Sequence, residues 1–458
     1  MATSSLKIDR ARFILTMDPE RRIIRDGTIV IEGSRFTHVG KAADLAAIFT
    51  DRVIDASAMV VTPGFFNGHM HISYAHPVRG IFPDDVADRL NTVFQLQSLM
   101  TEEEEYYTTL LGIIELLKNG STCFVDPGTT QFPDACMQAY EDSGCRIILG
   151  EGLTDIPETR KLPLYSTAEA IARAEQWIKK YDHRLNDRVR CWPMPFSAVN
   201  CTPELLKALK KLADEYQTGM TFHHTLTAKL QQSFKQKYGK LATEFLEEIG
   251  VLGSNVLLAH VMGLEDAEIE SLARTGTNVV MCPANAIKQA KGIKENGRLP
   301  EMLAKGIKVA LGSDSVNSSN HLDIVRSMNL AACLYKDARL DTKMIPAEKA
   351  LEMGTIMGAE AFGLARELGS VEKGKKADLL LFDTKRPEWQ ALFNPVNNLI
   401  YSADSRSIHT VIVDGRTVVE GYQQHFAAEW PLMQKVQEIG ESILARAGLS
   451  VAQRWPVV

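Results

Sequence analysis

Short apolar runs recur along the middle of the chain, and each is followed by a longer segment with the periodicity of an amphipathic helix. Runs of this length are typical of strands buried on both faces, and helices between them are typical of a parallel sheet. We interpret eight such runs as strands: residues 59–69, 121–128, 145–152, 189–196, 219–224, 255–261, 278–283 and 308–315. Eight strands with interposed helices predict an α/β fold, the TIM (β/α)8 barrel.

One of the intervening segments, residues 202–216, carries a helix start that can be read residue by residue. Thr202 is a typical N-cap, because its hydroxyl can accept a hydrogen bond from the first turn of the helix. Glu204 follows in that first turn, where a negative charge stabilises the helix dipole. The segment therefore predicts a helix that begins directly after Thr202.

Both ends of the chain are rich in β-strand formers. Residues 28–40 predict strands with a break at Gly33, and residues 375–383 predict a further strand. Residues 408–421 predict a hairpin that turns at Asp414-Gly415, since this dipeptide suits a tight turn between strands. Two β-rich ends on either side of a long α/β middle predict a small β-sandwich built from both termini.

The predicted boundaries follow from this arrangement. Residues 1–62 and 366–425 would form the composite sandwich, residues 63–365 the barrel, and residues 426–458 a C-terminal helical extension. In the extension, four apolar residues recur at helical spacing: Leu432, Val436, Ile439 and Ile443. Such a helix can pack on its own barrel or contact another subunit, and the spacing leaves both open.

The composition excludes several classes of protein. A net charge of −6 over 458 residues argues against nucleic acid as a partner, and the basic stretch 288–298 is interpreted as a solvated surface. No apolar run reaches the ~18 residues that a membrane span needs, and the N-terminus has no apolar core of a secretion signal. Seven cysteines without a CxxC pair predict free thiols in a reducing, cytoplasmic location.

Histidines stand at the ends of two predicted strands. His69 and His71 close the first strand, and residues two apart in a strand share a face, so both imidazoles can point toward one metal ion. His223 and His224 close the fifth strand. Adjacent strand residues face opposite sides, so only one of these two is expected to enter the barrel mouth.

His260 and Asp314 stand at the ends of the sixth and eighth strands. Taken alone, His260 is equally well interpreted as a histidine that forms ordinary hydrogen bonds at a strand end. Asp314 is equally well interpreted as a helix cap or a turn former. Together with the other histidines they fall at the carboxyl ends of barrel strands, where active sites of this fold lie. Three imidazoles and a carboxylate suit Zn²⁺ or a neighbouring transition metal.

The chain resembles the amidohydrolase superfamily, in particular its branch of triazine hydrolases and cytosine- or guanine-type deaminases. The resemblance covers nearly the whole chain, and the matching segments follow one another in the same order as in that branch. These segments are residues 60–71, 257–285, 309–319, 368–383 and 411–421.

The resemblance implies an enzyme that holds one divalent metal ion, with Zn²⁺ expected and Co²⁺, Mn²⁺ or Fe²⁺ as alternatives. It implies His69, His71, His223 and Asp314 as ligands, with His224 open as an alternative to His223. It implies catalytic roles for Asp314 and for His260, which would contact the reacting water or a substrate oxygen. The expected contacts to a small-molecule substrate are His224, Tyr74, Phe82, Phe196 and Asn285. A homo-oligomer of two or more subunits is also expected.

One departure from the branch bears on the reaction. The branch usually carries a glutamate three residues after the fifth-strand ligand, where it protonates a ring nitrogen, and this chain has Leu226 there, or Thr227 in the shifted register. Without that acid, attack on an aromatic ring carbon should be slower by ~10²–10⁴-fold. The sequence therefore favours metal-activated water attacking a carbonyl carbon of an N-substituted urea, amide or carbamate, as in the phenylurea and molinate hydrolases.

The alternative is an aminohydrolase or dechlorinase of an N-heterocycle that takes its acid from elsewhere. The sequence contains two candidates for this acid: Glu151, beyond the third strand, and His224. Either would have to reach the same barrel end as the histidines and Asp314.

Overall fold

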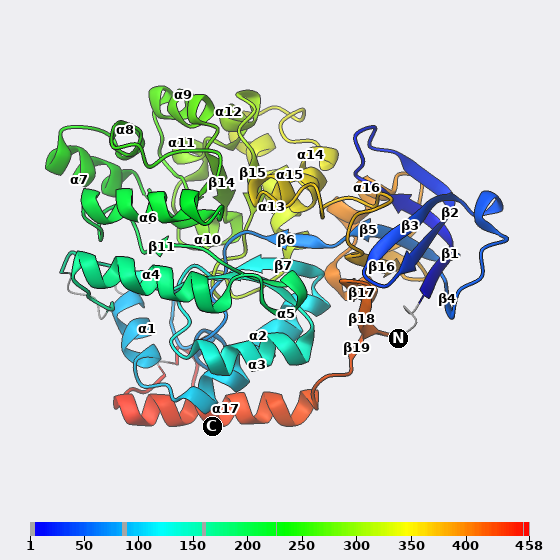
Figure 1. Ribbon diagram of the computed structural model, residues 1–458, viewed down its shortest axis with the longest axis horizontal. Coiled ribbons are helices and arrows are strands. Elements are labelled where there is room, and N and C mark those ends of the chain that lie inside the picture. The colour runs from blue at the N-terminus through cyan, green and yellow to red at the C-terminus, as the bar shows by residue number, and fades with distance from the viewer. Residues whose placement is uncertain (1–4, 85–88, 158–161, 226, 452, 458) are drawn as a thin grey trace.

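The computed structural model describes residues 5–84, 89–157, 162–225, 227–451 and 453–457. The chain forms a helix-wrapped barrel, with a sheet at one end that is built from the first and last strands (Figure 1). The N-terminal strands, drawn in blue, lie beside the C-terminal strands, drawn in orange, although they are far apart in the sequence.

All eight predicted barrel strands are present. Their bounds are β6 Phe65–Asn67, β7 Ser121–Val125, β8 Arg146–Leu149, β10 Val189–Cys191, β12 Met220–His224, β13 Val256–His260, β14 Asn278–Met281 and β15 Val309–Leu311. The short strands β9 (Gly152–Leu153) and β11 (Met194–Pro195) pair with each other beyond β8 and β10. The strands pair in parallel, and the barrel closes where Gly68 donates its N–H to the Leu311 carbonyl.

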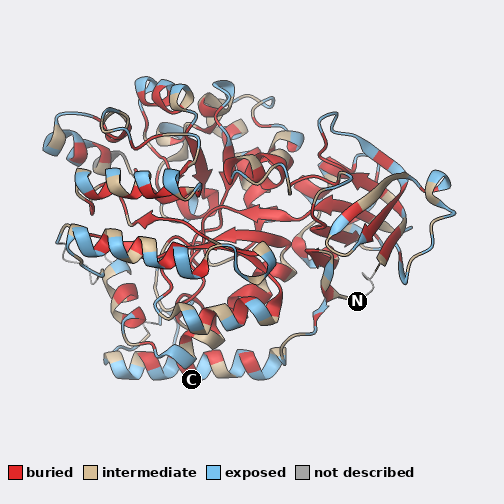
Figure 2. Cartoon of the chain, viewed as in Figure 1, coloured by how far each residue is buried: buried red, intermediate tan, exposed pale blue. Residues whose placement is uncertain are grey.

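Helices follow the strands and surround the barrel. Figure 2 shows that their outward faces are exposed while the strands they cover are buried. The helices of this part are α1 Arg89–Gln97, α2 Glu102–Lys118, α3 Pro133–Ser143, α4 Thr167–Tyr181, α5 Arg184–Asp187, α6 Pro203–Glu215, α7 Ala228–Tyr238, α8 Ala242–Glu248, α9 Asp266–Thr275, α10 Pro283–Lys288, α11 Ile293–Asn296, α12 Leu299–Ala304, α13 Ile324–Arg339, α14 Ala347–Gly354 and α15 Ile356–Ala361.

Two helix predictions are confirmed. Thr202 caps α6, and its hydroxyl accepts a hydrogen bond from the Leu205 N–H at 3.2 Å. The C-terminal helix α17 (Glu429–Ala447) packs against α1 and α2, and its four apolar residues at helical spacing are buried. Packing on the chain's own barrel thus accounts for this helix, while a homo-oligomer stays a prediction.

The two ends of the chain form one nine-stranded sheet. Its strands are β1 Ser5–Leu15, β2 Ile23–Glu32, β3 Arg35–Lys41, β4 Arg52–Asp55, β5 Met59–Pro63, β16 Leu379–Asp383, β17 Ile408–Val413, β18 Arg416–Glu420 and β19 Gln423–Gln424. The two halves join where β5 pairs antiparallel with β16. The sheet has its own apolar core, and the hairpin predicted at Asp414-Gly415 is present, with both residues at positive φ.

The run predicted as one barrel strand, residues 59–69, is divided between the two parts. Residues up to Pro63 belong to β5 of the terminal sheet, and the barrel strand β6 begins at Phe65. The break falls at Gly64, where a Cβ atom would lie 2.0 Å from the Thr122 hydroxyl. Continuous apolar residues therefore predicted the strands, but not the point at which the chain leaves one sheet for the other.

Two predictions from composition can be compared with the structure. All seven cysteines are free, as predicted, and all but Cys333 are buried. Among the described residues, no helix combines the length and apolar character needed to cross a membrane.

A buried charge cluster links the barrel to the terminal sheet. Arg146, at the start of β8, donates to Asp378 at 3.0 and 3.2 Å and to Asp414 at 3.3 Å. All three side chains are at most 5 % exposed. Removing one partner of such a cluster leaves buried charge without compensation, which costs far more than the loss of an exposed pair.

Arg146→Ala is therefore expected to lower the free energy of unfolding by about 3–5 kcal/mol. The measurement is a denaturant titration followed by circular dichroism. Arg274→Ala is the control, because it removes an exposed ion pair with Glu247 and should cost less than about 1 kcal/mol. Equal midpoint shifts for the two variants would show that the buried cluster contributes no more than a surface pair.

Candidate active site

Polar side chains gather at the carboxyl end of the barrel, on segments held by their neighbours. His69 and His71 follow β6, and between them Met70 donates its N–H to the Val125 carbonyl at 3.1 Å. Asp314 follows β15, and its N–H bonds the His69 carbonyl at 2.8 Å. These backbone bonds fix where the histidine and aspartate side chains start.

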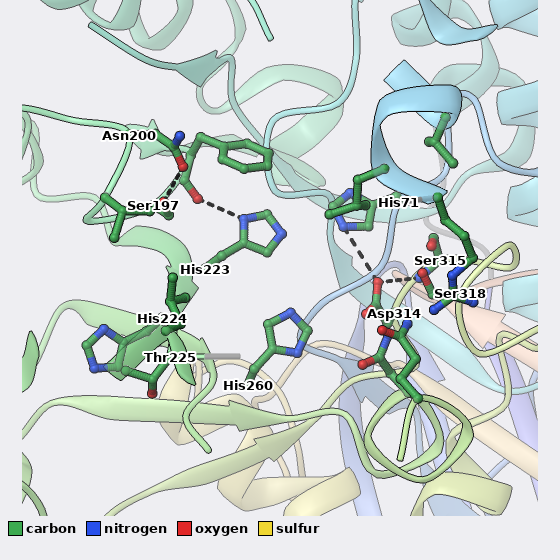
Figure 3. Close-up of a pocket in the computed structure, with 18 of the residues that line it drawn as sticks. His71, Ser197, Asn200, His223, His224, Thr225, His260, Asp314, Ser315 and Ser318 are labelled. Carbon is green, nitrogen blue, oxygen red and sulfur yellow. Dashed lines mark hydrogen bonds and ion pairs between the residues drawn. The ribbon is translucent and has the colours of Figure 1, made fainter. Parts of the chain in front are cut away.

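The five residues predicted for a metal site lie together. His69 is at the centre, with its ring 4.7–5.0 Å from the rings of His71, His223 and His260. Figure 3 shows the carboxylate of Asp314 facing His71, with Oδ1 3.6 Å from Nε2. The possible ligand atoms of His69, His71 and His223 lie within 4.8 Å of one another, as do those of His69, His260 and Asp314.

The structure separates the roles of His223 and His224. The Nδ1 atom of His223 lies 2.8 Å from the Phe196 carbonyl oxygen, which leaves Nε2 free to point into the cluster. The ring of His224 turns away from the cluster, and its Nε2 atom lies 2.9 Å from the Thr243 hydroxyl. This geometry favours His223 as the ligand, because a second hydrogen bond on the other ring nitrogen is typical of metal-binding histidines.

The donor set fits a divalent metal ion such as zinc. Both ring nitrogens of His69 and the Nδ1 atom of His71 are buried without a hydrogen-bond partner in the described part of the chain. Burial lowers the pKa of His69 well below its usual value and also lowers the pKa of His71, which favours the neutral form of both imidazoles. Neutral imidazole is the form that binds metal, and coordination would satisfy the unpaired nitrogens.

Two residues of the cluster adopt a backbone conformation that is uncommon outside glycine. His260 has φ +75° and Asp314 has φ +59°. Such conformations carry strain and collect at functional sites, where the surrounding structure holds them in place. Here they stand at the ends of β13 and β15, where the chain turns out of the barrel.

A cavity of about 250 Å³ opens over the cluster. Four of the predicted substrate contacts line it: Tyr74, Phe196, His224 and Asn285. The fifth, Phe82, lies outside the lining; it is half-buried and packs against the barrel core. Phe94, which the sequence did not single out, also lines the cavity, and its ring packs edge-on against Phe196 at 5.8 Å.

The cavity holds few groups that could act as an acid in place of the glutamate that the resemblance implies. Among the described lining residues, Asp314 is the only one with a carboxyl group. Glu151 lies elsewhere, where it accepts hydrogen bonds from Arg173 and Tyr165 at 2.8 Å. Leu226 lies outside the described residues. Glu151 is thus not the missing acid, and among the predicted alternatives only His224 reaches the cavity.

The structure adds one charged residue that sequence reasoning missed. Lys291 lines the cavity, is buried, and donates from Nζ to the Asn285 amide oxygen at 2.5 Å. The stretch 288–298 was interpreted as a solvated surface, and for Lys291 that interpretation was wrong. Its position beyond the seventh barrel strand, β14, was the available clue, because loops at that end form the site.

Comparison with known proteins agrees with the fold and the cluster. The Amidohydrolase family matches residues 60–418, and the chain belongs to that family. It is thus a hydrolase of carbon–nitrogen bonds with a barrel core and a metal site.

Two deaminases are similar to this chain over almost its whole length. A 5'-deoxyadenosine deaminase of Methanosarcina mazei is 31% identical over 436 residues, covering 95% of this chain and 97% of that protein. A 5-methylthioadenosine/S-adenosylhomocysteine deaminase of Desulforamulus reducens is 30% identical over 90% of this chain and 92% of its own length.

Solved structures share the fold. An adenosine deaminase from Xanthomonas campestris with bound zinc superposes with a TM-score of 0.87 at 24% identity, covering 96% of this chain and 99% of that one. Atrazine chlorohydrolase from Arthrobacter aurescens, complexed with zinc, gives a TM-score of 0.85 at 22% identity, covering 95% and 100%.

Proposed function

We propose that this protein removes an amino group from an adenosine-type N-heterocycle by hydrolysis. The observation that carries the proposal is the similarity, over almost the whole chain, to proteins named as 5'-deoxyadenosine deaminases, 31% identical for the Methanosarcina mazei protein. The aromatic walls of the cavity, Phe94 and Phe196, also suit a flat ring. Of the two readings of the sequence, the heterocycle aminohydrolase thus becomes the main one.

In this proposal His69, His71, His223 and Asp314 hold one divalent metal ion, with zinc expected. When bound, the metal supplies a nucleophile at neutral pH by lowering the pKa of water. The Asp314 carboxylate takes a proton from the attacking water and passes it to the departing nitrogen. His260, at the cluster's edge, stabilises the oxygen as charge develops on it.

A second candidate keeps the carbonyl substrate, an N-substituted urea, amide or carbamate. It is favoured by one observation: Asp314 is the only carboxyl group among the described residues that line the cavity. A carbonyl carbon needs no protonated ring nitrogen, so it tolerates a leucine at position 226.

The two candidates differ in their products, which gives the test. Metal-assayed protein is incubated with 5'-deoxyadenosine, adenosine, cytosine, an aryl urea, a thiocarbamate and an anilide. We expect ammonia from an amino heterocycle and no arylamine from the urea. Arylamine from the urea or anilide, without ammonia from any heterocycle, would overturn the proposal in favour of the second candidate.

A further inference from the structure

We infer that Lys291 is a catalytic residue that protonates the ring nitrogen of the substrate, in place of the acid that is absent at position 226. The inference rests on the proposed deamination, because only attack on a ring carbon requires this proton. It is argued from the buried Lys291 side chain in the cavity, together with Leu226, which stands where the resemblance to this branch implies a glutamate.

The surroundings of Lys291 indicate that its ammonium group acts within the cavity. The side chain lies in the loop between α10 and α11, and the residue is only 8% exposed. Among the described residues, the one hydrogen-bond partner of its Nζ atom is the amide oxygen of Asn285, a neutral group. No carboxylate lies within ion-pair distance of Nζ among the described residues, whereas buried lysines are ordinarily paired. Burying an unpaired ammonium group is energetically unfavourable, and this one faces the cavity in which a substrate would bind. We therefore infer that it has a functional role.

Several charged and titratable groups surround Lys291. They come from several elements: Asp314, Cys282, Arg89, His69, His223 and His260. Burial lowers the pKa of Lys291, Arg89 lowers it further, and Asp314 and Cys282 act in the opposite direction. The net effect is a pKa below the ordinary lysine value, and an ammonium of lower pKa gives up its proton more readily.

The proton balance of the reaction closes with Lys291 and Asp314 alone. As the water oxygen bonds to the ring carbon, Asp314 takes one water proton and Lys291 gives its proton to the adjacent ring nitrogen. The carbon–nitrogen bond to the amino group then breaks, with the Asp314 proton completing ammonia. The remaining hydroxyl proton leaves as the carbonyl forms and restores the Lys291 ammonium. The products are ammonia and a lactam that keeps its ring N–H.

The test compares variants of the metal-loaded enzyme with 5'-deoxyadenosine, or with the amino heterocycle that the wild type deaminates fastest. Lys291→Met keeps the length of the side chain without its charge, and kcat should fall by ~10²–10⁴-fold while KM and metal content stay within about threefold. Lys291→Arg keeps the charge but does not release a proton, and it should lose kcat similarly. Lys294→Met, at an exposed lysine of the same stretch, is the matched control and should behave as wild type.

Two further readouts separate proton transfer from a structural role. Wild-type kcat should decline as pH rises through the lowered pKa of Lys291, and Lys291→Met should lose that decline. Lys291→Ala leaves space for ethylammonium, which should restore part of kcat when added.

Three outcomes would each overturn the assignment of Lys291 as the proton donor. They are a kcat within threefold of wild type in Lys291→Met, a loss that follows metal content or KM alone, and full activity of Lys291→Arg. Failure of the wild type to release ammonia from any heterocycle overturns the proposed function itself, and the inference with it.

Discussion

Replacing His71 with alanine is expected to remove the bound metal and the hydrolytic activity together. His71 supplies one of three imidazoles whose ligand atoms lie within 4.8 Å of one another, and it is the histidine nearest to the Asp314 carboxylate. Residues that merely orient a ligand already contribute 10–100-fold to metal affinity, so loss of a ligand should cost at least about 100-fold. Metal content after dialysis and kcat at saturating substrate are the two measurements.

His76→Ala is the control for this variant. His76 is also a buried histidine, five residues further along the same segment, but its Nε2 atom pairs with Glu115 at 3.0 Å and it is not part of the cluster. Folded His76→Ala should keep its metal. A His71→Ala protein with full turnover and one metal per chain would refute the assignment of His71 as a ligand.

The second large effect is expected for Asp314→Asn. The substitution keeps the shape of the side chain, and asparagine tolerates the positive φ of +59° at this position, so the backbone should persist. What is lost is the charge that faces His71 and the group that we propose carries a proton to the leaving nitrogen. We expect kcat to fall by at least ~10²–10⁴-fold, with weaker metal binding in addition.

Asp323→Asn separates this effect from the general loss of a buried carboxylate. Asp323 is buried in the same loop region, where it caps α13 and accepts a hydrogen bond from Ser405, but it does not line the cavity. Its variant should lose stability rather than kcat. The role of Asp314 would be disproved by an Asp314→Asn enzyme that retains more than a tenth of wild-type kcat with metal bound.

Much of the fold could be predicted because its strands are buried on both faces. A strand such as β13 has no polar side, so it stands out in the sequence as an unbroken apolar run. The same property hid the division at Gly64, since β5 and β6 are both buried and the run continues through both. The change from one sheet to another depends on the approach of Thr122, a contact that no local pattern records.

The candidate site was predictable where one rule applied and not elsewhere. His69, His71, His223, His260 and Asp314 all stand at strand ends, and the barrel brings strand ends together. Residues on long loops have no such register: Phe82, predicted to contact substrate, lies outside the cavity lining, and Lys291 was overlooked. Burial of a lysine is set by the loops packed over it, which a basic stretch in the sequence does not reveal.

The pairing of β5 with β16 also constrains how the chain can be made. Met59 pairs with Asp383, so one strand leaves the ribosome more than 300 residues before its partner. At ~5–20 residues per second, the wait is roughly 15–60 s. During translation the β5 edge stays unpaired, and unpaired edges are where nascent chains aggregate. A gene truncated before β16 should therefore yield insoluble product even though every barrel strand is encoded.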